Sequence, residues 1–123
     1  MKALIIDDDR DIRTVARLSL TLVGGMDVIE AHSGRDGLRK ARDEHPDVIL
    51  LDMMMPTMSG LETLAALRSE PVTATTPVIF LTAKAAATDV ERLTALGAVG
   101  LLIKPFDPRT LPDEVRALVA RIL

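Results

Sequence analysis

Acidic, hydroxyl and basic side chains follow short apolar runs at four separate places in this 123-residue chain. They are Asp7, Asp8 and Asp9 after the first run, then Asp52, Thr82 and Lys104 after three later runs. Carboxylates held within a few ångströms of one another repel, and they stay ionised only where a cation neutralises them. Carboxylate oxygens are hard ligands, and among cations they favour Mg²⁺. A carboxylate can also attack phosphorus as a nucleophile, which forms an aspartyl phosphate.

A lysine and a hydroxyl would complete such a site. The ammonium group is a compact charge suited to a phosphoryl oxygen, and phosphoryl transfer depends mainly on positioning and charge neutralisation. Taken singly, each residue has a simpler interpretation. Acids after a strand often cap the next helix, and we assign Asp9 and Asp11 to capping and to the surface. Thr82 alone would be a strand-end hydroxyl and Lys104 a surface lysine, so only the joint spacing favours a site.

Five short apolar runs are predicted to be strands. Runs this short and this uniformly apolar suit strands buried on both faces, which indicates a parallel sheet with helices on both sides. Ligands of such sheets bind at the carboxyl ends of the strands. If the first, third, fourth and fifth strands are neighbours, the polar residues that follow them converge. The predicted strands are 3–6, 28–31, 48–51, 78–81 and 101–103.

Five helical segments alternate with these runs, so we predict an α/β fold. The first ends at Gly24-Gly25, the second is capped by Ser33 and closed by His45-Pro46, and the fourth ends at Gly97. The third has Leu61, Leu64, Ala65 and Arg68 on one face, and the fourth is predicted from residue 85. A proline inside a helix loses a hydrogen bond. We therefore predict a turn at 108–110 and a last helix from near Pro112.

Composition narrows the classes of function. The net charge is −3 and no basic cluster appears, so direct nucleic-acid or membrane binding is not expected. The absence of cysteine excludes disulfides and thiol chemistry. Only four apolar residues separate Met1-Lys2 from Asp7, too few for a signal peptide, so we expect a cytoplasmic protein. With no linker or repeat, residues 1–123 are predicted to form one domain.

Four segments of the sequence together resemble the receiver domains of bacterial two-component response regulators. Their order and spacing also match, with 30 residues from Asp52 to Thr82 and 22 from Thr82 to Lys104. The resemblance covers essentially the whole chain and implies a flavodoxin-like sheet in the order 2-1-3-4-5. The four segments are Leu4-Ile5-Ile6-Asp7-Asp8-Asp9, Asp52-Met53-Met54-Met55-Pro56 with Gly60, Leu81-Thr82-Ala83, and Lys104-Pro105-Phe106.

The resemblance implies a role for each matching position. Asp52 would accept the phosphoryl group, and Asp8 would ligate Mg²⁺ directly, with Asp7 helping directly or through water. The backbone carbonyl of Met54 would be a further metal ligand. The phosphoryl oxygens would be held by Thr82, Lys104 and the backbone N–H of Ala83, and Lys104-Pro105 would be a cis peptide.

The resemblance also implies partners and a mode of action. The phosphoryl group would come from a phosphohistidine on a sensor histidine kinase or a phosphotransfer protein. The domain would catalyse only its own phosphorylation and dephosphorylation, and it would not act as an enzyme on external substrates. Output would pass through a face formed by the fourth helix, fifth strand and fifth helix, which could also serve a dimer. The sequence alone leaves open whether the chain acts alone or belongs to a longer protein.

Three positions depart from the family pattern or tune it. Leu101 stands where an aromatic switch residue is usual, so we expect a smaller change on the output face. A large swing of Leu101 between free and activated structures would contradict this expectation. Met54 and Lys84 occupy positions that often set the lifetime of the phosphoryl group, and the sequence does not decide between fast and slow hydrolysis.

Two other functions are compatible with parts of the sequence. A haloacid-dehalogenase-like phosphohydrolase also uses an aspartyl nucleophile and Mg²⁺, and Asp7-x-Asp9 matches its motif formally. However, 123 residues leave no room for the cap domain of that class. A receiver that binds partners without phosphorylation is the other alternative. The presence of the complete set Asp7, Asp8, Asp52, Thr82 and Lys104 argues against it.

Overall fold

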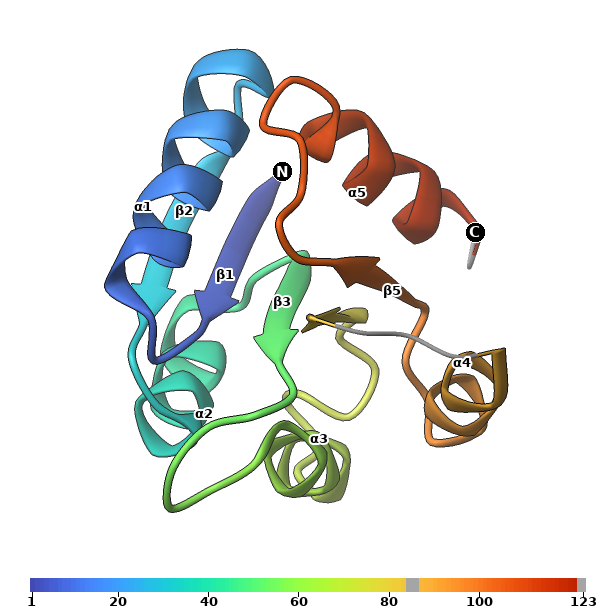
Figure 1. Ribbon diagram of the computed structural model, residues 1–123. Coiled ribbons are helices and arrows are strands. Elements are labelled where there is room, and N and C mark those ends of the chain that lie inside the picture. Colours follow the sequence, from blue (N-terminus) through green and yellow to red (C-terminus); the bar gives the residue numbers. More distant parts are fainter. Residues whose placement is uncertain (84–86, 122–123) are drawn as a thin grey trace.

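The computed structural model is a five-stranded parallel sheet with helices on both faces, and it describes residues 1–83 and 87–121 (Figure 1). The strand order is β2-β1-β3-β4-β5, which confirms the predicted order 2-1-3-4-5. The strands are β1 (Lys2–Ile6), β2 (Asp27–Ala31), β3 (Val48–Asp52), β4 (Val78–Thr82) and β5 (Gly100–Ile103). The helices are α1 (Arg10–Leu18), η1 (Ser19–Val23), α2 (Gly34–Glu44), α3 (Gly60–Ser69), α4 (Ala87–Ala95) and α5 (Leu111–Ala120).

The sheet divides the apolar core into two layers. In β1, Leu4 and Ile6 belong to one layer and Ala3 and Ile5 to the other, as expected when successive side chains point to opposite faces. Figure 1 shows α1 and α5 on one side of the sheet and α2, α3 and α4 on the other. Each fully buried large aliphatic side chain contributes about 1.5–3 kcal/mol. Every residue of β3 and β4 is buried, so these central strands form a rigid base for the loops that follow them.

Short polar side chains fix where the helices start. Asp9 accepts hydrogen bonds from the backbone N–H groups of Asp11 and Ile12, which confirms its predicted capping role at α1. Ser33 accepts from the N–H of Asp36 at the start of α2. Such caps satisfy N–H groups that have no partner inside the helix. The caps therefore fix the residues at which α1 and α2 begin after the preceding strands.

Two helical segments differ from the sequence prediction. The first continues beyond α1 as the π-helical turn η1, in which the N–H of Gly24 donates to the carbonyl of Ser19 at 3.1 Å. In α3 the buried apolar residues are Leu64 and Leu67, whereas Ala65 is exposed. The predicted start of the fourth helix at residue 85 lies outside the described residues.

The segment between β5 and α5 follows the prediction. A turn covers residues 108–110, α5 begins at Leu111, and Pro112 lies in its first turn, where its missing N–H costs nothing. Lys104-Pro105 is cis, as the family resemblance implies. After β5 the chain therefore returns to the core layer that contains Ala3 and Ile5, in which Leu111 and Val115 of α5 are buried.

Gly60 packs against the backbone at the end of β3. We expect Gly60→Ala to lower the free energy of unfolding by about 1–3 kcal/mol. A β-carbon at this position would lie 2.7 Å from the Cα of Met53 and against the carbonyl of Asp52. These are backbone atoms of the strand end and cannot swing aside. Urea denaturation followed by circular dichroism measures the change.

Gly37→Ala is the matched control for this substitution. The atoms nearest to its β-carbon would be side-chain atoms of Ile6, with Cγ1 at 2.8 Å, and not backbone atoms, and alanine is the better helix former. We expect a smaller loss than at Gly60. Equal losses at the two positions would refute the view that the backbone of Asp52 and Met53 cannot yield.

Candidate functional site

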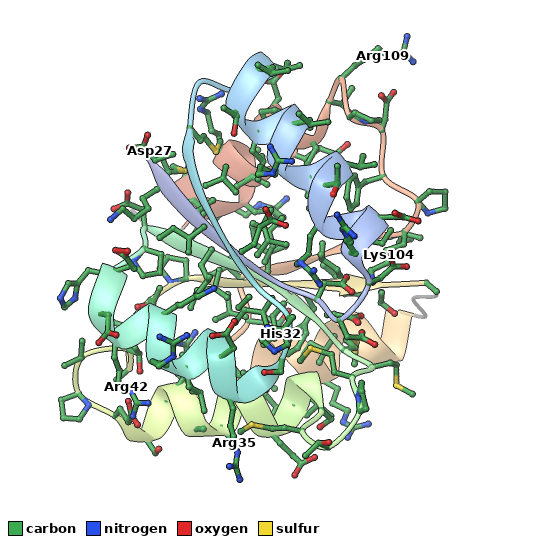
Figure 2. All side chains as sticks on the ribbon, turned by 90° about the vertical axis from the view of Figure 1, so that its left-hand side faces the viewer. Asp27, His32, Arg35, Arg42, Lys104 and Arg109 are labelled. Atoms are coloured by element: carbon green, nitrogen blue, oxygen red, sulfur yellow. The ribbon has the colours of Figure 1, made fainter. Side chains whose placement is uncertain are left out.

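A pocket of about 270 Å³ opens at the carboxyl ends of β1, β3, β4 and β5. It is lined by Asp7, Asp8, Asp9, Asp52, Met53, Met54, Thr82, Ala83 and Lys104. In Figure 2, Lys104 lies at this end of the sheet, far from Asp27, which begins β2. The predicted convergence of residues from four strands therefore occurs. It follows from the parallel sheet order, which brings four strand ends to one edge.

Three carboxylates in the pocket are arranged as metal ligands would be. Asp7, Asp8 and Asp52 each offer an oxygen, and these atoms all lie within 4.8 Å of one another. Asp7 and Asp52 are buried and Asp8 is exposed, so the cluster opens to solvent on one side. This set of hard oxygen donors fits Mg²⁺, which takes few carboxylates and keeps several waters. Asp7 is also oriented by the N–H of Asp9, which donates to its Oδ1 at 2.9 Å.

Lys104 binds two of these carboxylates at once. Its Nζ lies 2.6 Å from Oδ2 of Asp7 and 3.1 Å from Oδ1 of Asp52. Burial alone would lower the pKa of Lys104, but hydrogen bonds and charge interactions with Asp7 and Asp52 raise it above its usual value. The ammonium group is therefore charged near neutral pH and partly neutralises the acidic cluster.

The surroundings of Asp52 raise the pKa of its carboxyl group. Burial and, to a smaller extent, the negative charge of Asp7 raise the pKa, while Lys104 lowers it, and the net result is a rise from 3.8 to about 6. The N–H of Met54 donates to the same carboxylate over 3.4 Å, which also favours the ionised form. At pH 7 Asp52 is therefore largely ionised, which is the state that a nucleophile requires.

Thr82, Ala83 and Met54 also line the pocket. Thr82 is buried at the end of β4, and Ala83 follows it at the exposed rim. The side chain of Met54 is 81% exposed, so it stands at the pocket edge and not in the core. Leu101 is partly buried against the core layer that contains Phe80. Lys84, predicted to tune the phosphoryl lifetime, lies outside the described residues.

Three residues near the site were not predicted to take part in it. Asp9 and Met53 line the pocket, and both simply neighbour predicted residues in the chain. Arg13 of α1 donates from its guanidinium to the backbone carbonyl of Asp7 at 2.7 Å. Sequence spacing places Arg13 one turn into the helix, but nothing local indicates that its side chain folds back toward β1.

A doubly wound parallel sheet with an acidic pocket and a partly buried lysine at its carboxyl edge defines a class of α/β proteins suited to hold a cation beside a phosphoryl group. A comparison with family models matches residues 3–116 to the response regulator receiver domain. The chain is 37% identical to protein PilG of Pseudomonas aeruginosa, over 97% of this chain and 87% of PilG.

Two further comparisons agree. The chain is 38% identical to the alkaline phosphatase synthesis transcriptional regulatory protein PhoP of Bacillus subtilis, over 98% of this chain and 49% of PhoP. It therefore spans about half the length of such longer relatives. The chemotaxis protein CheY4 of Vibrio cholerae superposes with a TM-score of 0.88 at 35% identity, covering 95% of this chain and 97% of CheY4.

The chain belongs to the response regulator receiver domain family of two-component signal transduction. Members of this family are typically signalling proteins and interact with histidine kinases or phosphotransfer proteins. In the part of the chain that the structure describes, no helix is both long and apolar enough to cross a membrane.

Proposed function

We propose that residues 1–123 form one cytoplasmic receiver domain in which Asp52 accepts a phosphoryl group. The donor would be a phosphohistidine of a sensor kinase or phosphotransfer protein. The observation that carries the proposal is the convergence of Asp7, Asp8 and Asp52 within 4.8 Å of one another, with Lys104 bound to two of them. One ammonium group does not neutralise the charge of three carboxylates this close together, so a second cation would stabilise their ionised forms.

The residues present suit Mg²⁺, which would be held by Asp7, Asp8, Asp52 and the backbone carbonyl of Met54. When bound, Mg²⁺ would neutralise charge on the carboxylates and on the phosphoryl oxygens. Asp8 is exposed and Asp7 buried, so we expect Asp8 to meet an incoming ion first.

The reaction would run as an in-line displacement. A carboxylate oxygen of Asp52 would form the new bond to phosphorus while the bond from phosphorus to the donor nitrogen breaks, and the leaving imidazole would keep that electron pair and take a proton from solvent water. Lys104, the hydroxyl of Thr82 and the N–H of Ala83 would hold the three phosphoryl oxygens. Since Thr82 ends β4 and Lys104 directly follows the neighbouring strand β5, movement toward the phosphoryl group would reach the α4–β5–α5 face.

The first test is phosphorylation of the wild-type chain by a small acyl phosphate. Intact mass should increase by one phosphoryl group with Mg²⁺ and should not change in EDTA. Peptide mapping should place the group on Asp52. A group mapped to another residue would mean that the nucleophile is wrong. No mass gain under conditions where Mg²⁺ binding is measured would favour a phosphorylation-independent interaction module.

The same preparation tests whether the domain is an enzyme on external substrates. We propose that it catalyses only its own phosphorylation and dephosphorylation, so a generic phosphate monoester should not be turned over. Steady turnover would instead favour a phosphohydrolase. We propose that output is delivered through the α4–β5–α5 face, to a partner protein or to a second copy of the domain.

A further inference from the structure

Arg13 lies on α1, outside the pocket lining, yet it contacts the backbone of a buried pocket residue. Its Nη1 donates to the carbonyl oxygen of Asp7 at 2.7 Å. Asp7 follows the last paired residue of β1, because the register between β1 and β2 ends with Ile6 opposite Ala31. A buried carbonyl needs a hydrogen-bond partner, and Asp7 is completely buried. The guanidinium supplies that partner at the point where the sheet ends.

Glu30 on β2 forms an ion pair with the same guanidinium group through a different nitrogen. Nε of Arg13 lies 3.4 Å from Oε1 of Glu30. Arg17, one helical turn further along α1, pairs with Oε2 of the same carboxylate at 3.0 Å. Arg13 therefore bridges α1, the end of β1 and the edge strand β2, and most of its side chain is removed from solvent.

From this geometry we propose that Arg13 is a positioning residue for the cation site, an inference that rests on the proposed function. It holds the Asp7 backbone so that the Asp7 carboxylate faces Asp8 and Asp52. The N–H of Asp9 donates to the Asp7 carboxylate, so the turn from Asp7 to Asp9 is fixed both from the carbonyl side and from the carboxylate side. Groups that orient metal ligands typically change metal affinity by about 10–100-fold when removed.

Charge and position predict opposite effects for this residue, and this makes the proposal testable. Arg13 is a cation near an acidic site, so its field alone opposes Mg²⁺, and removing it would tighten binding. If Arg13 positions Asp7, its removal weakens binding. We expect Arg13→Gln to weaken Mg²⁺ binding about tenfold. Arg13→Lys keeps the charge but not the two-sided geometry of the guanidinium, and it should also weaken binding.

Arg17→Gln is the matched control. It removes the same charge from the same Glu30, one turn further from the pocket, and should leave Mg²⁺ affinity within about twofold. Isothermal titration calorimetry with Mg²⁺ measures affinity for the wild type and the three variants. Denaturation in urea checks that each variant is folded at the temperature of the titration.

A second measurement uses the metal-free protein. The amide proton of Asp9, bound to Asp7, should change its chemical shift and exchange faster in Arg13→Gln, but not in Arg17→Gln. If the wild type binds Mg²⁺ and Arg13→Gln binds it as tightly or more tightly, Arg13 is not a positioning residue. The proposed cation site would still stand in that case. Absence of Mg²⁺ binding by the wild type would overturn the cation site and, with it, this inference.

Discussion

Asp52→Asn is expected to abolish the phosphoryl gain and, without Mg²⁺, to make the domain more stable at pH 7. An amide oxygen is not a useful nucleophile toward phosphorus, so the transfer stops. The gain in stability has a separate cause. The carboxylate of Asp52 is buried beside Asp7, and this environment raises its pKa to about 6. Keeping it ionised in the folded state therefore costs free energy that a neutral amide does not cost.

The sign of the pH dependence follows from this pKa. The folded-state value of about 6 exceeds the ordinary value of 3.8, so between these limits the folded protein binds more protons than the unfolded chain. The contribution of Asp52 to stability is fully present below about pH 4 and is lost as the pH rises through about 6. At pH 7 Asp52→Asn should thus be more stable by about 1–3 kcal/mol, and the difference should shrink toward pH 4.

Urea denaturation in EDTA, followed by far-ultraviolet circular dichroism at pH 7 and pH 4, measures this difference. Asp43→Asn, at an exposed position of α2, is the matched control and should show no pH-dependent gain. A variant less stable than the wild type at pH 7, or a difference that does not vary with pH, would contradict the argument. Mg²⁺ should reduce the advantage of Asp52→Asn, because the ion stabilises the wild-type carboxylate.

The residues that meet at the pocket could be predicted because they lie at strand ends. Asp7, Asp52, Thr82 and Lys104 each follow a short apolar run, and a parallel sheet brings such positions to one edge. The order of the strands was supplied by the family resemblance. The turn before α5 was predictable from Pro108 and Pro112 together, because a helix that began at Pro108 would place Pro112 beyond its first turn, where a proline loses a hydrogen bond.

Other features depend on contacts between distant residues, and local patterns do not encode them. Arg68 donates hydrogen bonds to the carbonyls of Thr73, Thr76 and Gly97, and so ties two connections of the sheet together. The sequence indicated only that Arg68 lies on an inner helical face. The π-helical turn η1 at the end of α1 covers a stretch in which Ser19 and Thr21 alternate with apolar residues, and no glycine or proline within it signals a change of helix type. The bridging position of Lys104 between two acids likewise requires the fold.

Lys104→Met is expected to change two properties of the pocket in opposite directions. Mg²⁺ should bind more tightly, by roughly tenfold, because Nζ of Lys104 now engages oxygens of Asp7 and Asp52 that the ion would use. Phosphorylation by an acyl phosphate should nevertheless slow by about 100-fold, because a preorganised donor to the phosphoryl group is lost. Methionine has a similar length without the charge, so the apolar stem of the side chain keeps its packing.

Calorimetric titration with Mg²⁺ and the rate of mass gain at saturating Mg²⁺ separate these two effects. Lys40→Met is the control, since Lys40 pairs with Asp36 at 3.2 Å, away from the pocket, and should change neither property. Lys104→Arg keeps the charge with a larger head group, and its Mg²⁺ affinity should remain closer to that of the wild type.

A weaker affinity for Mg²⁺ in Lys104→Met would refute the competition between the ammonium group and the ion. It would mean that Lys104 holds the two carboxylates in place for the metal. An unchanged rate of phosphorylation would mean that Lys104 takes no part in the transfer. The combination of tighter Mg²⁺ binding and slower transfer is the result expected if Lys104 engages the two carboxylates before activation and the phosphoryl group during it.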